Sequence, residues 1–315
     1  MNEITQEMRA AAKRLLEEGR VDCVIGYTKG TVPMREQPYF AYTPQEAENL
    51  VWTGFCVNNL ANFLIGRSGR NAVIAQGCVS RNIAGLIKEN QVNRDDVYII
   101  GLHSPGMLDS GKIEAEFPDR VITEVEEDGE EIVVRGRDFE ERLERKKYKR
   151  NNCYTCTHRN AVLYDEFLGE QGPQTGGGDI DKVAAPWEKL DPEQRWAQFE
   201  AEFKDCIRCY ACRNVCPLCY CDVCFVDENN PQWCGKGQEE PDIFTFHIIR
   251  AFHCAGRCTD CGACESACPV GIKMRYLTSK LEKDIRQLYD YQPGLDLETP
   301  TPLAVYSSND PDVAK

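Results

Sequence analysis

The chain opens with apolar residues that recur every three or four positions, from Ile4 to Leu16, before Gly19. This period is typical of an amphipathic helix, and glycine is a common stop signal. Continuous apolar runs follow at 21–27, 72–75 and 97–102, with a helical pattern over about 80–90 between the last two. Strand, helix and strand at this spacing form a βαβ unit, which predicts an α/β domain with a small parallel sheet.

Local signals predict the remaining elements. Thr43-Pro44-Gln45-Glu46 has the form of a capping box with proline at the first helical position, so a helix is expected from there towards Trp52. Asp128-Gly129 lies between the β-rich runs 121–125 and 131–135, which predicts a β-hairpin. Further helices are expected through Leu60–Leu64 and over 139–150, 186–205, 242–253 and 273–291.

The charge balance narrows the class of protein. Among 315 residues, 37 Lys and Arg face 51 Asp and Glu, a net charge of −14. An acidic surface argues against nucleic-acid partners, whose affinity depends on neutralising phosphates. No stretch approaches the roughly 18 apolar residues of a membrane span, and the start lacks signal-peptide features. A cytoplasmic location is expected, in which the 18 cysteines serve as thiolate ligands and not as disulfides.

Two cysteine runs share one spacing. Both read C-x2-C-x2-C-x3-C-P, the first over 206–217 and the second over 258–269. This is the bacterial ferredoxin spacing, in which three thiolates hold one iron–sulfur cube and the fourth reaches the neighbouring cube. We therefore assign one 4Fe-4S cluster to Cys206, Cys209, Cys212 and Cys268, and a second to Cys258, Cys261, Cys264 and Cys216.

Zinc and disulfides explain this spacing poorly. A zinc site needs two C-x2-C pairs and has no use for a third evenly spaced cysteine or for the trailing Cys-Pro. A disulfide framework suits a short secreted chain. The spacing thus predicts a two-cluster, ferredoxin-like α+β module over 206–291 with a helical insertion. We expect the α/β domain over 1–168, a glycine-rich linker and helix over 169–205, and an extended tail over 292–315.

Other cysteines leave their chemistry open. Cys153 and Cys156 form a C-x2-C pair that fits half a zinc site, a redox pair or half a cluster site. Cys78, with Cys56 as candidate for the last position, would complete a third 4Fe-4S cluster; otherwise these are structural thiols. Inside the insertion, a further cluster, a zinc ion or structural thiols are alternatives for Cys219, Cys221, Cys224 and Cys234. The histidines are not assigned as ligands.

The loops after the predicted strands are the expected place for a flavin. Neither G-x-G-x-x-G nor a P-loop occurs, so a standard dinucleotide fold is not supported. Open α/β sheets nevertheless bind ligands at the carboxyl ends of their strands. The candidates, each of which could equally be an ordinary loop residue, are Lys29, Gly30, Gly77, Arg81 and Asn82. The basic run 139–150 is either a solvated face or a docking patch for an acidic partner or cofactor phosphates.

Three segments resemble a known family. Gly77-Cys78-Val79-Ser80-Arg81, the stretch 99–107 and Cys153-Tyr154-Thr155-Cys156 are together similar to the beta subunits of deazaflavin-reducing hydrogenases and formate dehydrogenases. The branch with an added two-cluster ferredoxin module, containing Cys-Pro-Leu-Cys-Tyr-Cys, is the more similar one. The resemblance covers about residues 15–290. Ser104 stands where the family pattern leads us to expect a cysteine, which favours Cys56 as a replacement ligand.

The resemblance implies an iron–sulfur flavoprotein that passes electrons between a partner's clusters and a flavin, FAD, in an anaerobic oxidoreductase complex. The implied partners are heterodisulfide-reductase-like, hydrogenase or formate-dehydrogenase subunits, with ferredoxin as a further candidate. The sequence has two alternative functional interpretations. One is a flavin-free adaptor whose clusters transfer electrons between two redox proteins, and the other is a zinc-binding interaction module.

Overall fold

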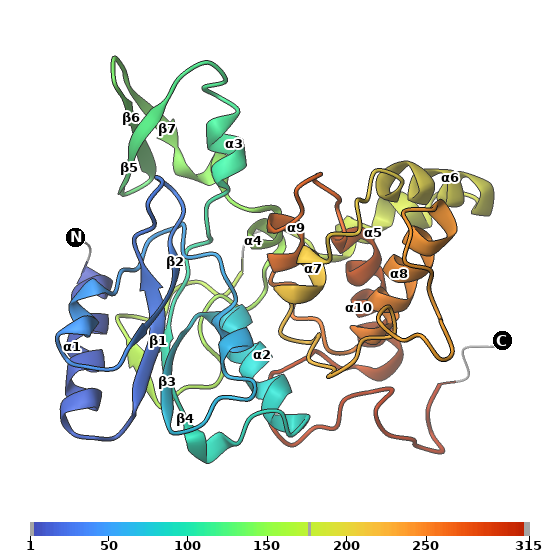
Figure 1. Cartoon of the computed structure of the whole chain (residues 1–315), viewed down its shortest axis with the longest axis horizontal. Coiled ribbons are helices and arrows are strands. Elements are labelled where there is room, and N and C mark those ends of the chain that lie inside the picture. The colour runs from blue at the N-terminus through green and yellow to red at the C-terminus, as the bar shows by residue number, and fades with distance from the viewer. Residues whose placement is uncertain (1–2, 176–177, 312–315) are drawn as a thin grey trace. The chain divides into compact units, whose positions relative to one another are not determined.

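The structure is a computed structural model that describes residues 3–175 and 178–311. The chain divides into two compact units (Figure 1). Unit 1 comprises Met1–Ser80 and Asn90–Gly178, and unit 2 comprises Arg81–Glu89 and Asp179–Lys315. The predicted linker glycines Gly176 and Gly177 lie outside the described residues. No helix in the described ranges is long and apolar enough to cross a bilayer.

A five-stranded sheet of order β2-β1-β3-β4-β8 forms the centre of unit 1. Four strands are parallel, namely β1 (Cys23–Thr28), β3 (Asn71–Ala75), β4 (Val97–Leu102) and β8 (Glu166–Leu168), while β2 (Gln37–Ala41) is antiparallel at one edge. Every residue of β3 and β4 is buried, as parallel strands covered on both faces require. The predicted small parallel sheet is confirmed. The sequence did not predict β2 or β8, because β2 contains a proline and β8 has only three residues.

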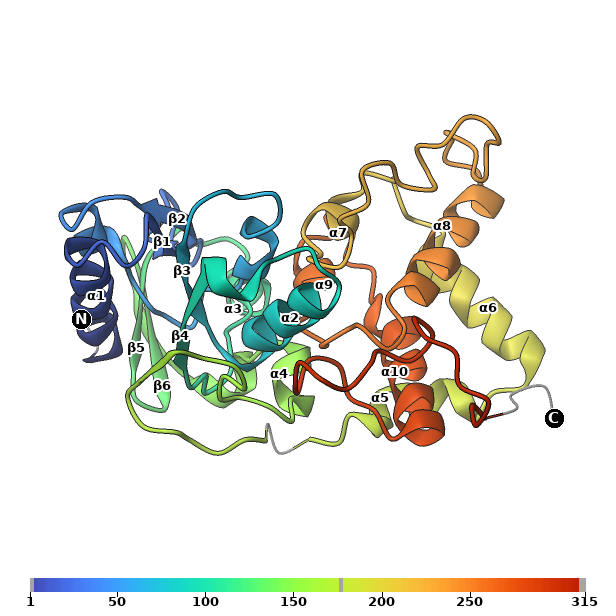
Figure 2. The ribbon, with the colours of Figure 1, turned by 90° about the horizontal axis from the view of Figure 1, so that it is seen from below.

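Helix α1 (Glu3–Glu17) packs against β1 and β8 (Figure 2). Its buried stripe includes Met8, Ala11 and Leu15, as the apolar period predicts. The βαβ crossover is made by α2 (Gly77–Lys88). The capping box forms, since the Glu46 amide donates to Thr43 Oγ1 at 3.2 Å, yet the predicted helix towards Trp52 is wrong. A 3-10 turn ends at Asn49, because the next residues turn into an extended path that pairs with β1.

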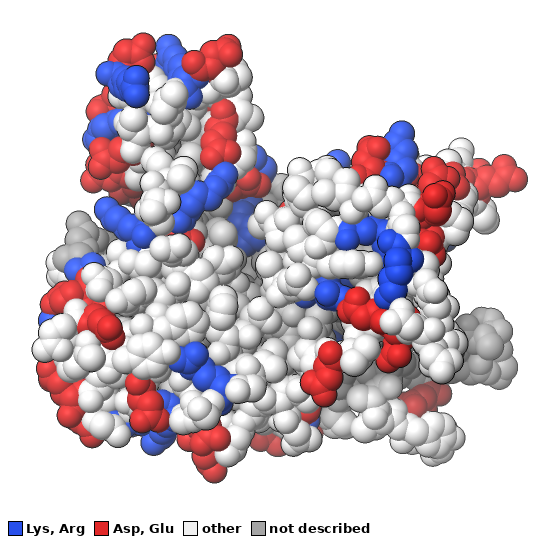
Figure 3. All heavy atoms as spheres, in the orientation of Figure 1, with Lys and Arg blue, Asp and Glu red and all other residues white. Residues whose placement is uncertain are grey.

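A separate three-stranded sheet in unit 1 contains β5 (Ile122–Asp128), β6 (Glu131–Gly136) and β7 (Glu140–Glu144) (Figure 1). The predicted hairpin is present, with Asp128 opposite Glu131. The helix predicted over 139–150 is wrong, because this segment pairs with β6 and then makes only a short 3-10 turn, Arg145–Tyr148. Arg142 forms ion pairs with Asp128 and Glu131, and both signs of charge mix over this sheet (Figure 3). This matching favours a solvated face over a docking patch.

The described residues of unit 2 form helices joined by loops and include no strand, so the β part of the expected α+β module does not appear there. The expected helix over 186–205 is two helices, because Asp191 and Pro192 begin a new one with a capping box. The expected helices over 242–253 and 273–291 form with small shifts of their ends. The helices are α5 (Asp181–Glu188), α6 (Pro192–Phe203), α7 (Ala211–Asn214), α8 (Glu240–His253), α9 (Ala263–Ser266) and α10 (Arg275–Tyr289).

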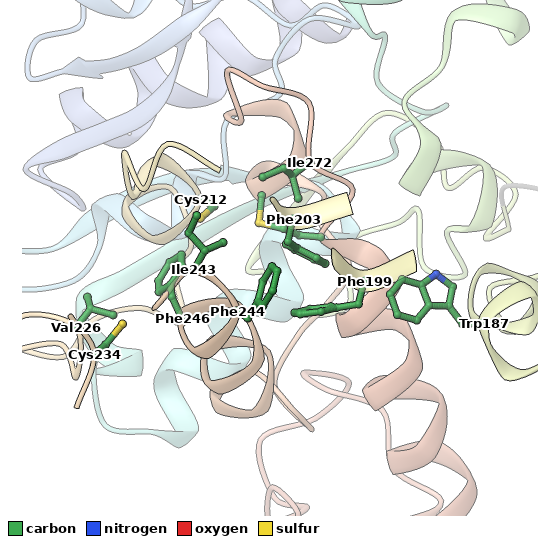
Figure 4. Close-up of a cluster of buried hydrophobic side chains, with 11 residues drawn as sticks. Trp187, Phe199, Phe203, Cys212, Val226, Cys234, Ile243, Phe244, Phe246 and Ile272 are labelled. Atoms are coloured by element: carbon green, nitrogen blue, oxygen red, sulfur yellow. The ribbon is translucent and has the colours of Figure 1, made fainter. Parts of the chain in front are cut away.

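Aromatic side chains of α6 and α8 fill the core of unit 2 (Figure 4). Phe203 is fully buried, with its ring centre 4.8 Å from that of Phe199 and 4.5 Å from that of His247. Replacing Phe203 by alanine is expected to destabilise unit 2 by about 3–5 kcal/mol, because it removes buried contacts and leaves a cavity. Anoxic urea unfolding followed by circular dichroism measures this. Phe252→Ala is the control, since Phe252 is 61% exposed and its loss should change stability by only about 0.5 kcal/mol.

Candidate metal centres

The two cysteine runs fold into loops with the same backbone path. The third residue of each run is left-handed, with φ of 51° at Arg208 and 56° at Asp260. The fifth is left-handed as well, with φ of 59° at Tyr210 and 69° at Gly262. Such φ values are uncommon outside glycine, so their repetition at matched positions is a specific property of the pair. Alternating handedness turns successive N–H groups to one side, as in many Fe–S sites.

The first predicted ligand set lies around one small cavity in unit 2. Its lining includes Cys206, Cys209, Cys212 and, from the other run, Cys268. Two backbone amides point at these sulfurs, from Arg208 to Cys206 Sγ at 3.4 Å and from Ile272 to Cys268 Sγ at 3.3 Å. His247 Nε2 lies 3.3 Å from Cys206 Sγ. N–H groups directed at thiolate sulfur are the hydrogen bonds that tune an iron–sulfur cluster, so this donor set fits a cube.

The thiols of the second predicted set lie near one another. The thiol of Cys264 interacts electrostatically with those of Cys261 and Cys216, and the thiol of Cys258 interacts with that of Cys261. Burial raises the pKa of Cys264 to about 12. A thiol whose pKa is raised in this way gives up its proton only when a cation compensates the thiolate, which bound iron does. The donors therefore fit a second cube, again with the fourth thiol supplied by the other run.

A single-ion site has a different geometry. Among residues 3–175 and 178–311, no three Cys, His, Asp or Glu side chains converge on a point where one ion could bind. In a cube each thiolate binds a different iron, so the core itself keeps the four sulfurs apart. This finding therefore concerns mononuclear sites and leaves the two thiol sets available to clusters.

A buried arginine that the sequence analysis missed lies among these thiols. Arg250 on α8 is 5% exposed, and its Nη2 donates to the carbonyl of Cys212 at 3.0 Å. Its guanidinium is in electrostatic range of thiols from both runs, those of Cys212, Cys216 and Cys264. The signal was present in the sequence, since an arginine on the buried stripe of an apolar helix needs a specific partner.

The pair Cys153 and Cys156 lies in unit 1, on and just after α4 (Asn151–Thr155). The amide of Met107 donates to Cys153 Sγ at 3.3 Å. The start of α2, where Cys78 lies, packs on the chain after Cys156, because a Cβ on Gly77 would fall 1.8 Å from the carbonyl oxygen of His158. The Cys56 thiol instead donates to the Val51 carbonyl at 3.7 Å, and burial raises its pKa. The ligand role of these four cysteines stays a prediction.

The insertion cysteines separate into two groups. Cys219, Cys221 and Cys224 line a second cavity of unit 2, of about 440 Å³. Cys234 is instead buried in the hydrophobic cluster (Figure 4), where its thiol donates to the Asp242 carbonyl at 3.3 Å. The irregular spacing of these residues gave no indication of this division.

The residues predicted to hold a flavin make contacts within their own units. A Cβ on Gly30 would lie 1.8 Å from the carbonyl oxygen of Arg35, and Gly77 is packed as closely against His158. Arg81 Nε donates to the Pro293 carbonyl at 2.9 Å. Asn82 is buried with its Nδ2 unpaired, while Lys29 is exposed. The glycines and Arg81 therefore have structural roles that need no flavin, and these contacts alone do not define a cofactor cradle.

Comparison with known proteins gives relatives of nearly full length. No family model matches the sequence. The F420-dependent formate dehydrogenase subunit beta of Methanocaldococcus jannaschii is 26% identical over an alignment of 350 positions, gaps included, that covers 92% of this chain and 92% of that protein. The F420-dependent formate dehydrogenase 1 subunit beta of Methanococcus maripaludis is 26% identical over an alignment of 357 positions that covers 93% of this chain and 92% of that protein.

A solved structure of the F420-reducing [NiFe] hydrogenase complex from Methanosarcina barkeri, derivatised with xenon, contains a chain with 16% identity. The match covers 65% of this chain and 90% of that chain with a TM-score of 0.41. The two sequence relatives confirm the resemblance first indicated by three short segments. Over more than nine tenths of its length, the chain is similar to the beta subunits of two F420-dependent formate dehydrogenases.

Proposed function

We propose that this chain is the electron-transferring beta subunit of an oxidoreductase complex and that unit 2 holds two 4Fe-4S clusters. One observation carries the proposal: Cys268 borders the same cavity as Cys206, Cys209 and Cys212, although it belongs to the other run. The matching left-handed positions of the two loops support it. The relatives, which are beta subunits of F420-dependent formate dehydrogenases, support the same class of function.

Bound clusters would supply transfer of single electrons, and the chain's own residues set the conditions. Because each run contributes to both ligand sets, the same two loops would hold both clusters. The amides of Arg208 and Ile272 stabilise negative charge on the ligand sulfurs. The aromatic core around Phe203 and Phe246 excludes water from one side of the first site.

A flavin in unit 1 is the finer part of the proposal. A deazaflavin carries hydride, a pair of electrons, whereas a cube carries one, and FAD bridges the two because it accepts electrons singly or in pairs. The support is the resemblance and the relatives' dependence on F420. The proposed partners are formate-dehydrogenase, hydrogenase or heterodisulfide-reductase-like subunits, with ferredoxin as a further candidate. The alternative is a flavin-free adaptor.

Iron, sulfide, zinc and flavin counted per chain in anoxically purified, full-length protein test the proposal. We expect at least eight irons and eight sulfides from the two ligand sets. Flavin released on denaturation, identified by its absorbance, is expected in addition. Protein that contains iron but no flavin, even after reconstitution, would support the alternative function of a flavin-free adaptor. Protein that contains only zinc, or that gives no magnetic resonance signal on reduction, would contradict both forms of the proposal.

A further inference from the structure

The 440 Å³ cavity of unit 2 has a composition that the two-cluster proposal does not use. One side is formed by three thiols of the insertion, those of Cys219, Cys221 and Cys224. The α8 side contributes the imidazole of His253 and the guanidinium of Arg250. The cavity opens to the surface, since Cys221 and His253 are exposed. Three thiols and one imidazole thus border a space of cofactor size.

The wall of this cavity favours an anionic occupant. Arg250 is more than nine-tenths buried, and its Nε has no hydrogen-bond partner within the described structure. The other two lining arginines are each paired with a carboxylate, Arg213 with Asp227 at 2.7 Å and Arg257 with Glu89. Arg250 thus adds a positive charge at the cavity wall that no carboxylate neutralises among the described ion pairs, and this charge attracts a negatively charged occupant.

We propose that this cavity binds a further 4Fe-4S cluster, with Cys219, Cys221 and Cys224 as thiolate ligands and His253 as the fourth. The inference rests on the proposed function. Soft thiolates select iron–sulfur clusters or zinc, and imidazole also binds iron. The space is far larger than one ion needs, and these side chains do not converge on a point. Cys234, the fourth cysteine of the insertion, lies elsewhere, and the buried Cys254 is near Cys219 but does not line the cavity. His253 is therefore the remaining nitrogen or sulfur donor on the cavity wall.

The location gives the cluster a role. The amide of Cys219 donates to the carbonyl of Cys216 at 3.0 Å, and Cys216 is assigned to the second cluster, so the two sites are neighbours. One electron would leave the second cluster, which is oxidised, and reduce the further cluster, with no bond made or broken. Imidazole in place of a thiolate removes one negative charge from the cluster, and histidine ligation raises cluster potentials. This site is therefore the expected point of electron exit towards a docked partner.

Iron counted in three variants of the full-length protein, purified without oxygen, tests the ligand set. Cys221→Ser is expected to contain four irons fewer than the wild type, because Cys221 has no packing role at its exposed position. Cys234→Ser is the matched control and should keep the wild-type iron count. His253→Cys should also keep it, since a thiolate replaces the imidazole.

Pulsed magnetic resonance supplies a readout that folding alone does not move. The reduced wild type should show coupling to an imidazole nitrogen, and His253→Cys should lose it. In that variant the reduction potential of this cluster should fall. At a fixed solution potential, the ratio of reduced to oxidised cluster should decrease at least tenfold, which corresponds to about 59 mV for one electron.

Four results would overturn the inference while leaving the two-cluster proposal intact. They are an unchanged iron count in Cys221→Ser, loss of four irons in Cys234→Ser, absence of nitrogen coupling in a wild type that contains iron, and zinc in the wild type in place of the iron of this further cluster. A wild type that contains no iron at all would instead remove the proposed function itself.

Discussion

Replacing Cys268 by serine is expected to empty the cluster of the first cysteine run and to leave the cluster of its own run in place. Cys268 lies at the cavity of Cys206, Cys209 and Cys212, while the thiol of Cys264, four residues earlier, lies in range of Cys216. The variant should lose four irons. Unit 2 should also become less stable, because metal binding and folding are coupled in such sites.

Two reference variants show which cluster is lost. Cys209→Ser removes a ligand of the first set, and Cys261→Ser removes one of the second. The low-temperature magnetic resonance spectrum of reduced Cys268→Ser should match that of Cys209→Ser. A match to Cys261→Ser would show that each run holds its own cube, and the reciprocal ligand assignment would then be wrong.

What the sequence could predict followed from periodic signals. A fixed cysteine spacing is set by the shape of one cube, so the spacing alone indicated two ligand sets, of which the first lines one cavity in the structure. The parallel sheet was predictable because β3 and β4 are continuous apolar runs with a helix between them. The hairpin was predictable because Asp128-Gly129 suits its turn.

The features that the sequence could not predict depend on contacts between residues far apart in the chain. Strand β7 reads as a charged helix, since the acids that neutralise Arg142 lie 11 and 14 residues earlier and become neighbours only by strand pairing. The cysteines and the histidine that line the insertion cavity have no regular spacing in the sequence. Only the fold shows that His253, at the end of α8, lines the cavity with three thiols while Cys234 is buried elsewhere.

Arg250→Met is expected to lower the reduction potentials of both predicted clusters without removing their iron. The guanidinium lies in range of thiols from each ligand set, and no carboxylate is paired with it among the described ion pairs. A buried positive charge stabilises the more negative, reduced state of a nearby cluster, so its removal favours the oxidised state. At a fixed solution potential, the ratio of reduced to oxidised cluster should fall at least tenfold. This corresponds to a decrease of about 59 mV in the reduction potential of a one-electron couple.

The Arg250→Lys variant distinguishes the effect of the positive charge from that of the guanidinium's hydrogen-bonding geometry. Lysine keeps the positive charge but cannot reproduce the guanidinium's planar set of donors, including the bond to the Cys212 carbonyl. Its potentials should therefore lie between those of the wild type and Arg250→Met, as read from anoxic redox titrations followed by magnetic resonance. If both variants keep their iron and titrate like the wild type, the arginine does not tune the clusters. A fall in iron in the methionine variant alone would show that its charge is needed to assemble the thiolate sites, since uncompensated buried thiolates repel one another.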